Sequence, residues 1–90
     1  MATFTKTDMC LGDEIKANDI IHHAGRNHFY FVTNLCTMKQ HNGEWENGVC
    51  YIPATRLGPG SYTYDLNDIL GYKMFVRPCS MFDSEWTIIS

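Results

Sequence analysis

Residues 28–35 (HFYFVTNL) constrain the fold more than any other stretch of the chain. Aromatic and β-branched residues are dense in this run and no helical periodicity is present, so it predicts a β-strand. Residues 25–27, just before it, are turn-forming, because Gly and Asn tolerate positive φ. Residues 20–24 are a second extended segment. The sequence therefore predicts a β-hairpin made of residues 20–24 and 28–35.

Shorter extended segments follow this hairpin along the chain. Two Asn-Gly pairs, at 42–43 and 47–48, favour a hairpin tip in residues 37–48 that carries Trp45 in the open. Three further strands are separated by turn signals and complete the sheet, the last by pairing back into it. They are residues 48–52, which end at Pro53, residues 74–77, with Met74 and Val76 as the apolar positions, and residues 85–89.

Residues 55–73 predict a long loop between two of these strands. Residues 62–64 within it fit either a short strand or the tip of the loop. Residues 65–71 are the only predicted helical turn, with Asp65 as its cap and Gly71 as its end. Five to six short strands and at most one short helix predict an all-β, mainly antiparallel fold, either a small barrel or a partly open roll.

Ninety residues make a single domain, 1–90, whose first ten residues are expected to fray. Near the C-terminus Pro78 fixes φ and lacks a backbone donor, so a strand must end or lie at a sheet edge there. Met81 and Phe82 follow as two large apolar side chains. We expect these two residues to plug one end of the barrel.

Residues 75–82 (FVRPCSMF) match an aromatic-Val-Arg-Pro-x-x-Met-Phe signature, and residues 49–51 match a Val-x-Tyr strand. The first hairpin matches more loosely, at residues 23–25 and 30–32. Over residues 20–85 the chain resembles a family of small uncharacterised bacterial and phage domains of SH3-like β-barrel type. It departs from that family at Ala24, where the family has Lys, and in a longer loop over residues 53–72. The resemblance implies an SH3-like barrel and no particular activity.

Composition narrows the classes of function. The chain is 44% hydrophobic and 13% aromatic, which is typical of a globular protein. Its formal charge of −3 argues against a nucleic-acid reader, which needs a basic surface. The four cysteines have no close pair and no signal peptide precedes them, which favours reduced thiols and a cytoplasmic location, the host cytoplasm for a phage-encoded protein.

Neither catalysis nor metal binding is predicted. A structural zinc site usually presents close pairs of ligands, and the nearest approach here is Cys36 with His41. Adjacent His22 and His23 would point to opposite faces of a strand. No nucleophile elbow, phosphate-binding loop or Cys/His signature is present, so we expect a protein that is not an enzyme and carries no cofactor.

Five residues are candidates for binding. The Arg77 guanidinium either faces an anion at the barrel rim or forms a structural salt bridge to Asp13, Glu14 or Asp83. Tyr62 and Tyr64 would share one side of a strand and, with Arg56, either stack on a ring and contact a phosphate or simply cover the core. Trp45 is either exposed for a partner or folded back onto the sheet.

These features favour a non-enzymatic module that binds a protein partner or a second copy of itself. The family's range adds the hypothesis of a phage-encoded inhibitor of a host or defence factor. The alternative is a protein that binds or sequesters a nucleotide or cyclic nucleotide through Arg56, Tyr62, Tyr64 and Arg77. An SH3-like nucleic-acid reader is a third hypothesis, which the negative charge disfavours.

Overall fold

The computed structural model describes residues 11–70 and 73–89, and their regular structure is all strand or short 3-10 helix. Six antiparallel strands form one sheet, so the predicted all-β fold is confirmed. The strands are β1 (Ile20–His23), β2 (His28–Lys39), β3 (Trp45–Gly58), β4 (Ser61–Tyr64), β5 (Phe75–Pro78) and β6 (Trp86–Ile88). The 3-10 helices are η2 (Leu11–Asp13), η3 (Leu66–Ile69) and η4 (Cys79–Met81).

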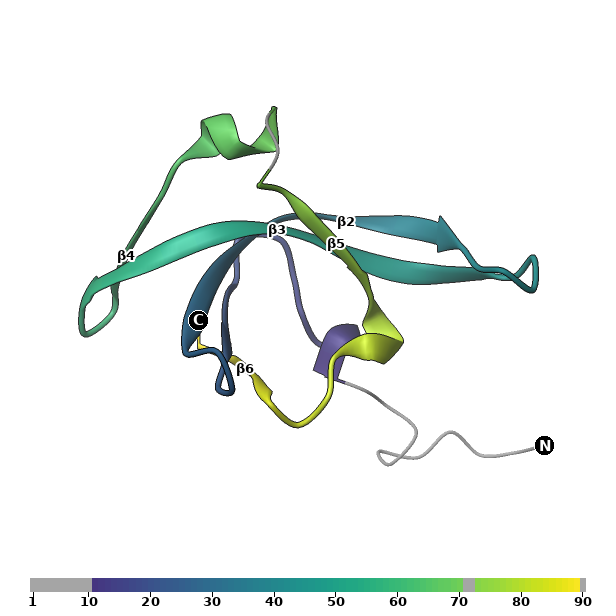
Figure 1. Ribbon diagram of the computed structural model, residues 1–90, viewed down its shortest axis with the longest axis horizontal. Helices are drawn as coiled ribbons and strands as arrows, with labels where there is room; N and C mark the ends of the chain where they lie inside the picture. Colours follow the sequence, from purple (N-terminus) through teal and green to yellow (C-terminus); the bar gives the residue numbers. More distant parts are fainter. Residues whose placement is uncertain (1–10, 71–72, 90) are drawn as a thin grey trace.

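The long strand β3 organises the sheet (Figure 1). One edge of β3 pairs with β2 along the hairpin. The other edge pairs with β5 at residues 48–51 and with β4 near residues 54–58. The predicted stop at Pro53 is wrong, because β3 continues through it. Pro53 lies between the end of the β5 pairing and the start of the β4 pairing. A missing backbone donor is tolerated at such an unpaired edge.

The predicted long loop over residues 55–73 is also wrong in part. Residues up to Gly58 belong to β3, and residues 61–64 form β4 rather than a loop tip. The predicted helical turn is η3, and the Asp65 side chain caps it by accepting from the Asn67 N–H at 2.9 Å. The predicted end of that turn at Gly71 and the predicted fraying of residues 1–10 lie outside the described residues.

The sheet does not close into a barrel. The hydrogen-bonded order is β4-β3-β2-β1-β6, with β5 beside β3, and among the described strands β5 and β6 do not pair with each other. Side chains fill this opening instead. Phe82 and Trp86 lie 4.9 Å apart between ring centroids and pack with Tyr51 of β3. Short β5 and three-residue β6 leave too little backbone for a continuous ladder.

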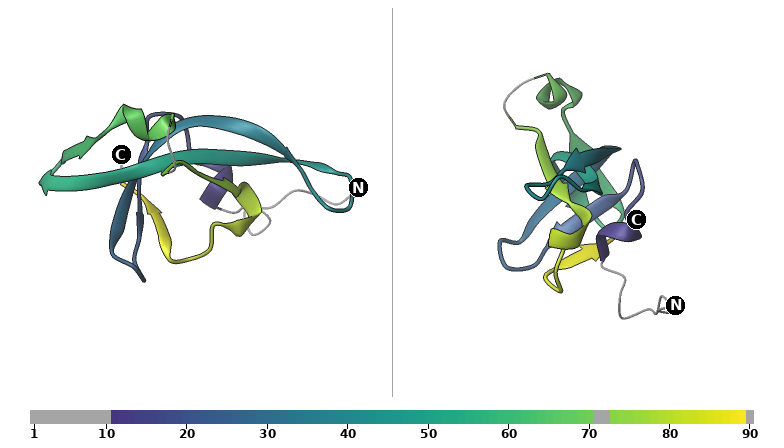
Figure 2. Two further views of the ribbon diagram at one scale, coloured as in Figure 1. Left: turned by 45° about the horizontal axis from the view of Figure 1, so that its top comes forward. Right: turned by 90° about the vertical axis from the view of Figure 1, so that its right-hand side faces the viewer.

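The far ends of β2 and β3 form an arm that extends beyond the other strands (Figures 1 and 2). We use "arm" for residues 34–48. Its tip is the predicted Asn42-Gly43 turn, with Gly43 at φ 88°. The second Asn-Gly pair does not form a turn, because Asn47 and Gly48 pair with β2 within β3. Trp45 is 65% exposed, which agrees with the first of its two predicted readings.

Apolar side chains lie on both faces of the sheet. The inner cluster is the larger and includes buried residues of β1, β2, β3 and β6 together with the segment after β5. The outer cluster is smaller and is built on Ile20, Phe31 and Ile52. Phe29, Ala54, Tyr62 and Met74 pack against it while remaining partly exposed. One sheet therefore has to cover two apolar faces with only 90 residues.

The predicted plug is correct for one of its two residues. Phe82 is 3% exposed and belongs to the inner cluster, whereas Met81 is 56% exposed. Met81 ends the single turn of η4, and the chain turns inward only at the next residue. A two-residue plug would need both side chains on the inner side of this turn, which one 3-10 turn does not provide.

Candidate functional site

A pocket of about 470 Å³ lies beside Phe75, where β5 begins. We call it the Phe75 pocket. Its walls come from the end of the β1–β2 turn, from the start of β2, from the middle of β3 and from β5. The lining residues are Asn27, His28, Phe29, Tyr30, Pro53, Ala54, Thr55, Arg56 and Phe75. The volume falls within the range of about 300–1,000 Å³ typical of small-molecule sites.

The pairing of the strands explains why a pocket forms at this place. β5 pairs with β3 up to Tyr51 and β4 pairs from Ala54, which leaves the edge of β3 uncovered at Pro53. The Phe75 ring stands beside this gap, with its centroid 6.0 Å from that of Tyr30 and 5.5 Å from that of Tyr51. The floor of the pocket is therefore aromatic and fixed by neighbouring rings.

The lining of the Phe75 pocket also includes polar residues and one cationic residue, Arg56. The Tyr30 hydroxyl and His28 Nδ1 lie 3.5 Å apart. Arg56 is an exposed residue of the lining, and its side chain shares a face of β3 with its partner Tyr62. The lining residues include no carboxylate and no thiol, so they offer no carboxylate base and no cysteine nucleophile. An apolar floor with one cationic residue in the lining is suited to binding an apolar group that carries a negative charge nearby.

Arg77 has the structural role that was one of its two predicted readings, but with different partners. Its Nε donates to the Tyr51 hydroxyl at 3.3 Å and its Nη1 donates to the Met81 carbonyl at 3.3 Å. Its guanidinium carbon lies 5.3 Å from the centroid of the Trp86 ring. These contacts of Arg77 are neutral groups and ring faces, and among the described residues no ion pair with Glu14 or Asp83 is found. Arg77 fastens the η4 turn to the inner cluster.

The predicted group of Arg56, Tyr62 and Tyr64 is only partly brought together. Arg56 pairs with Tyr62 in the β3–β4 register, and both tyrosines lie on the same side of β4, as predicted. However, both tyrosine rings pack against residues of the outer cluster. Tyr64 stacks on Phe31 at 3.8 Å between centroids, and Tyr62 packs on Phe29 at 5.4 Å. Neither tyrosine lines the Phe75 pocket, so covering the core is their observed role.

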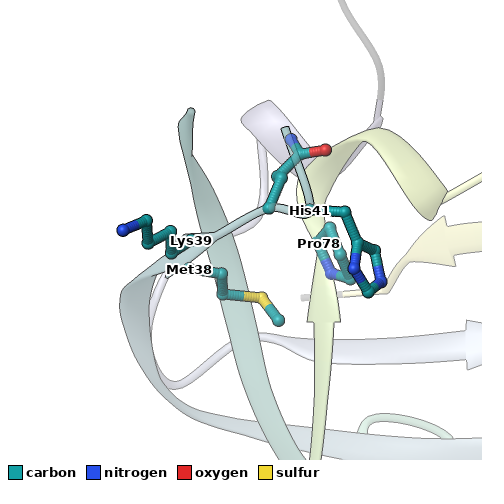
Figure 3. A pocket seen from close by; sticks show the side chains of 5 residues that line it. Met38, Lys39, His41 and Pro78 are labelled. Carbon is teal, nitrogen blue, oxygen red and sulfur yellow. The ribbon is translucent and has the colours of Figure 1, made fainter. Parts of the chain in front are cut away.

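A second pocket, of about 390 Å³, lies between the arm and Pro78 (Figure 3). We call it the arm pocket. It is lined by Met38, Lys39, Gln40, His41 and Pro78. Glu46 of the arm accepts from the Ser80 N–H at 3.0 Å and also from the Gln40 side chain. The hydrogen bonds from Ser80 lower the pKa of the Glu46 carboxyl, and they tie the arm to η4.

Large apolar side chains are exposed around the start of β5. They come from η3, from the residue after it and from β5 itself, and Leu70 is 88% exposed. Phe75 belongs both to this surface and to the Phe75 pocket. We call the set the η3–β5 surface; it consists of Leu66, Ile69, Leu70, Phe75 and Val76. Phe75 and Val76 are consecutive on β5 and face opposite sides of the strand, so the set offers exposed apolar contacts on both of its faces.

Sequence reasoning missed Phe75 because it assigned the apolar positions of this strand to Met74 and Val76. The strand begins one residue later, and Phe75 and Arg77 pair with the inner-face residues Tyr51 and Val49. A shift of one residue exchanges the two faces of a strand. The aromatic position at the start of the C-terminal signature was the signal that could have identified Phe75.

Two structural findings and the comparison with known proteins complete the description of the site. In residues 11–70 and 73–89, no group of three or more His, Cys, Asp or Glu side chains is placed to hold a metal ion. The same residues include no helix with the length and apolar character needed to cross a bilayer. Comparison with protein-family models, with curated proteins and with solved structures found no match. The resemblance to SH3-like domains therefore stays a prediction.

Proposed function

We propose that this protein is a non-enzymatic binding module whose η3–β5 surface engages a protein partner. The observation that carries the proposal is the group of exposed apolar side chains that includes Leu70 and Phe75 and adjoins the Phe75 pocket. A partner that covers these side chains removes apolar surface from water, which is the main favourable term in most protein association. One apolar side chain of the partner would enter the pocket as an anchor.

The charge at the pocket suggests what the partner presents. Arg56 belongs to the pocket lining, which contains no carboxylate to neutralise it. A partner segment with an aromatic or aliphatic residue beside an acidic one would match both the floor and Arg56. Inhibition of a host or defence factor is the form of this function that the resemblance to phage domains favours.

We also propose that the sheet is a partly open SH3-like roll. The curl of β1 and β6 beneath β3 in Figure 1 supports this arrangement, as does the side-chain closure by Phe82 and Trp86. A roll with one open side leaves the edge of β3 at Pro53 accessible, and this edge is where the Phe75 pocket lies.

Affinity capture from a host lysate with matched variants tests the binding function. The double variant Phe75→Ala with Leu70→Ser removes the anchor and the most exposed leucine of the η3–β5 surface. Leu57→Ser is the matched control, since Leu57 is also an exposed leucine but belongs to the β3–β4 hairpin. The unchanged protein and the control should recover the same partner, and the double variant should lose it. Recovery by all three, or no partner from a monomeric protein, would refute the proposal.

A small ligand is the second candidate function, because the Phe75 pocket has the volume of a small-molecule site. Tyr30 and Phe75 offer ring faces and Arg56 offers a cation, which suits a planar anion such as a nucleotide. A panel of nucleotides and cyclic nucleotides tests it by thermal unfolding. A ligand at about 100 times its Kd stabilises the folded state by about 2.7 kcal/mol, and Arg56→Ala should abolish this shift. No shift across the panel would eliminate the candidate.

A further inference from the structure

Three sulfur-containing side chains lie on one face of the β2–β3 hairpin. Cys36 pairs with Gly48 across β2 and β3, and Cys50 lies two residues further along β3. Met38 lies two residues after Cys36. Side chains two apart on a strand share a face, so Cys36, Met38 and Cys50 all point to the same side. Burial raises the pKa of the Cys50 thiol, and Cys36 is close enough for its own thiol to raise that pKa further.

Gly48 provides the space that these sulfurs occupy. A Cβ atom at Gly48 would lie 2.5 Å from Met38 Sδ and 3.0 Å from Cys36 Sγ. Both sulfurs therefore fill the volume that any larger residue at position 48 would take. A glycine inside a strand costs stability, and close approach by other atoms is a common reason for its presence.

The sulfur group has a closed side and an open side. Cys50 is 4% exposed, whereas Cys36 and Met38 are half-buried. The arm pocket opens on Met38, and Figure 3 shows the Met38 thioether and the His41 imidazole on the side of the arm toward Pro78. Of the three sulfur residues Met38 lines the arm pocket and Cys36 is also partly accessible, so the sulfurs can be reached from solvent on this side.

We propose that Cys36, Cys50 and Met38 form a binding site for Cu(I), with His41 at its entrance. Thiolate and thioether sulfurs are soft ligands, and soft ligands select Cu(I). Zinc prefers four tetrahedral ligands, of which this face supplies only two thiolates. On binding, each thiol releases one proton to solvent and donates its sulfur electron pair to the ion, so no oxidant or reductant is consumed.

A metal suits the geometry better than a disulfide. Cys36 and Cys50 are diagonal neighbours across the ladder, and such pairs have Cα atoms about 7–8 Å apart. A disulfide usually needs a Cα separation below about 7 Å. A metal ion placed between the two sulfurs spans the longer distance.

Competition with the Cu(I) chelator bicinchoninate, under anaerobic reducing conditions, tests the site. The unchanged protein should bind one Cu(I) per chain. Cys36→Ser and Cys50→Ser should each weaken binding by about a hundredfold, since losing a direct ligand costs at least as much as losing an outer one. Met38→Leu keeps the volume and should weaken it by about tenfold. Met81→Leu is the matched control and should bind as the unchanged protein does.

A measurement on the unchanged protein alone covers the case in which a variant does not fold. With one equivalent of Cu(I) bound, Cys36 and Cys50 should resist alkylation, as read by peptide mass spectrometry, while Cys10 and Cys79 react as they do without metal. Protection of Cys10 or Cys79 instead would overturn the proposal. Equal affinity in the unchanged protein, Cys36→Ser and Met38→Leu would overturn it too.

Discussion

Substitution of Gly12 by alanine should destabilise the fold strongly, because Gly12 lies directly against the backbone of η4. A Cβ atom at this position would lie 2.3 Å from the Cys79 carbonyl oxygen and 2.5 Å from the Cys79 Cα. These are backbone atoms, so no rotation of a side chain relieves the clash. The Cys79 thiol also donates to the Gly12 carbonyl at 3.2 Å, and this hydrogen bond joins η2 to η4.

The size of the effect follows from how far the two turns must separate. Ordinary contacts of a Cβ atom begin near 3.4 Å, so η2 and η4 would have to move apart by about 1 Å. Overpacking of this kind costs about 1–3 kcal/mol, and loss of the thiol hydrogen bond adds to it. For a domain of this size, about 2 kcal/mol lowers Tm by about 8–16 °C.

Urea unfolding measures the loss, with fluorescence of the buried Trp86 as the probe. Gly58→Ala is the matched control, because nothing lies within 4 Å of a Cβ atom there and the backbone is not in the positive-φ region. We expect the control to stay within about 1 kcal/mol of the unchanged protein. If Gly12→Ala unfolds at the same urea concentration as the control, the packing of η2 against η4 is not what we describe.

Three further predictions concern the C-terminal segment and the arm. Phe82→Ala should lower the free energy of unfolding by about 3–5 kcal/mol, while the neighbouring Met81→Ala should change it by less than about 0.5 kcal/mol in the same urea titration. Arg77→Met should cost about 1–3 kcal/mol through loss of its hydrogen bonds and ring contacts, and a change in partner binding without a change in stability would instead favour a role in recognition. The folded-state pKa of Cys50, about 11, exceeds its ordinary value of 9.0, so the unfolded chain loses this proton first. The contribution of this thiol to stability is complete below pH 9.0 and is lost as the pH rises through about 11. The free energy of unfolding should be measured across that range for the unchanged protein and for Cys50→Ala. This loss should be seen only in the unchanged protein.

Local signals predicted much of the fold. The first hairpin, the tip at Asn42-Gly43 and the cap of η3 by Asp65 follow from residues close together in sequence, and all three are present. The path of β3 through Pro53 could not be predicted in that way. It depends on where β4 and β5 stop along the same edge, which is set by pairings between distant segments.

The candidate sites were predicted less well than the fold. Arg56 was identified, but Phe75 was assigned to the wrong face because the register of a four-residue strand is not marked by its own sequence. The two thiols of the arm are fourteen positions apart, so a search for close ligand pairs passed over them. Only the register of β2 with β3 brings Cys36 and Cys50 together.

The exposed apolar surface has a physical origin in the single sheet. A chain of 90 residues buries about 60–65% of the surface that it exposes when unfolded, which suffices for one compact core. Here the inner face takes the larger share, and among the described residues the outer cluster is covered by side chains that stay partly exposed, Phe29, Ala54, Tyr62, Tyr64 and Met74. The connection from β4 to β5 cannot bury its own leucines against a face already so thinly covered. A second molecule that covered these exposed residues would remove them from water, and this is the physical reason for our proposal that recognition occurs at the η3–β5 surface.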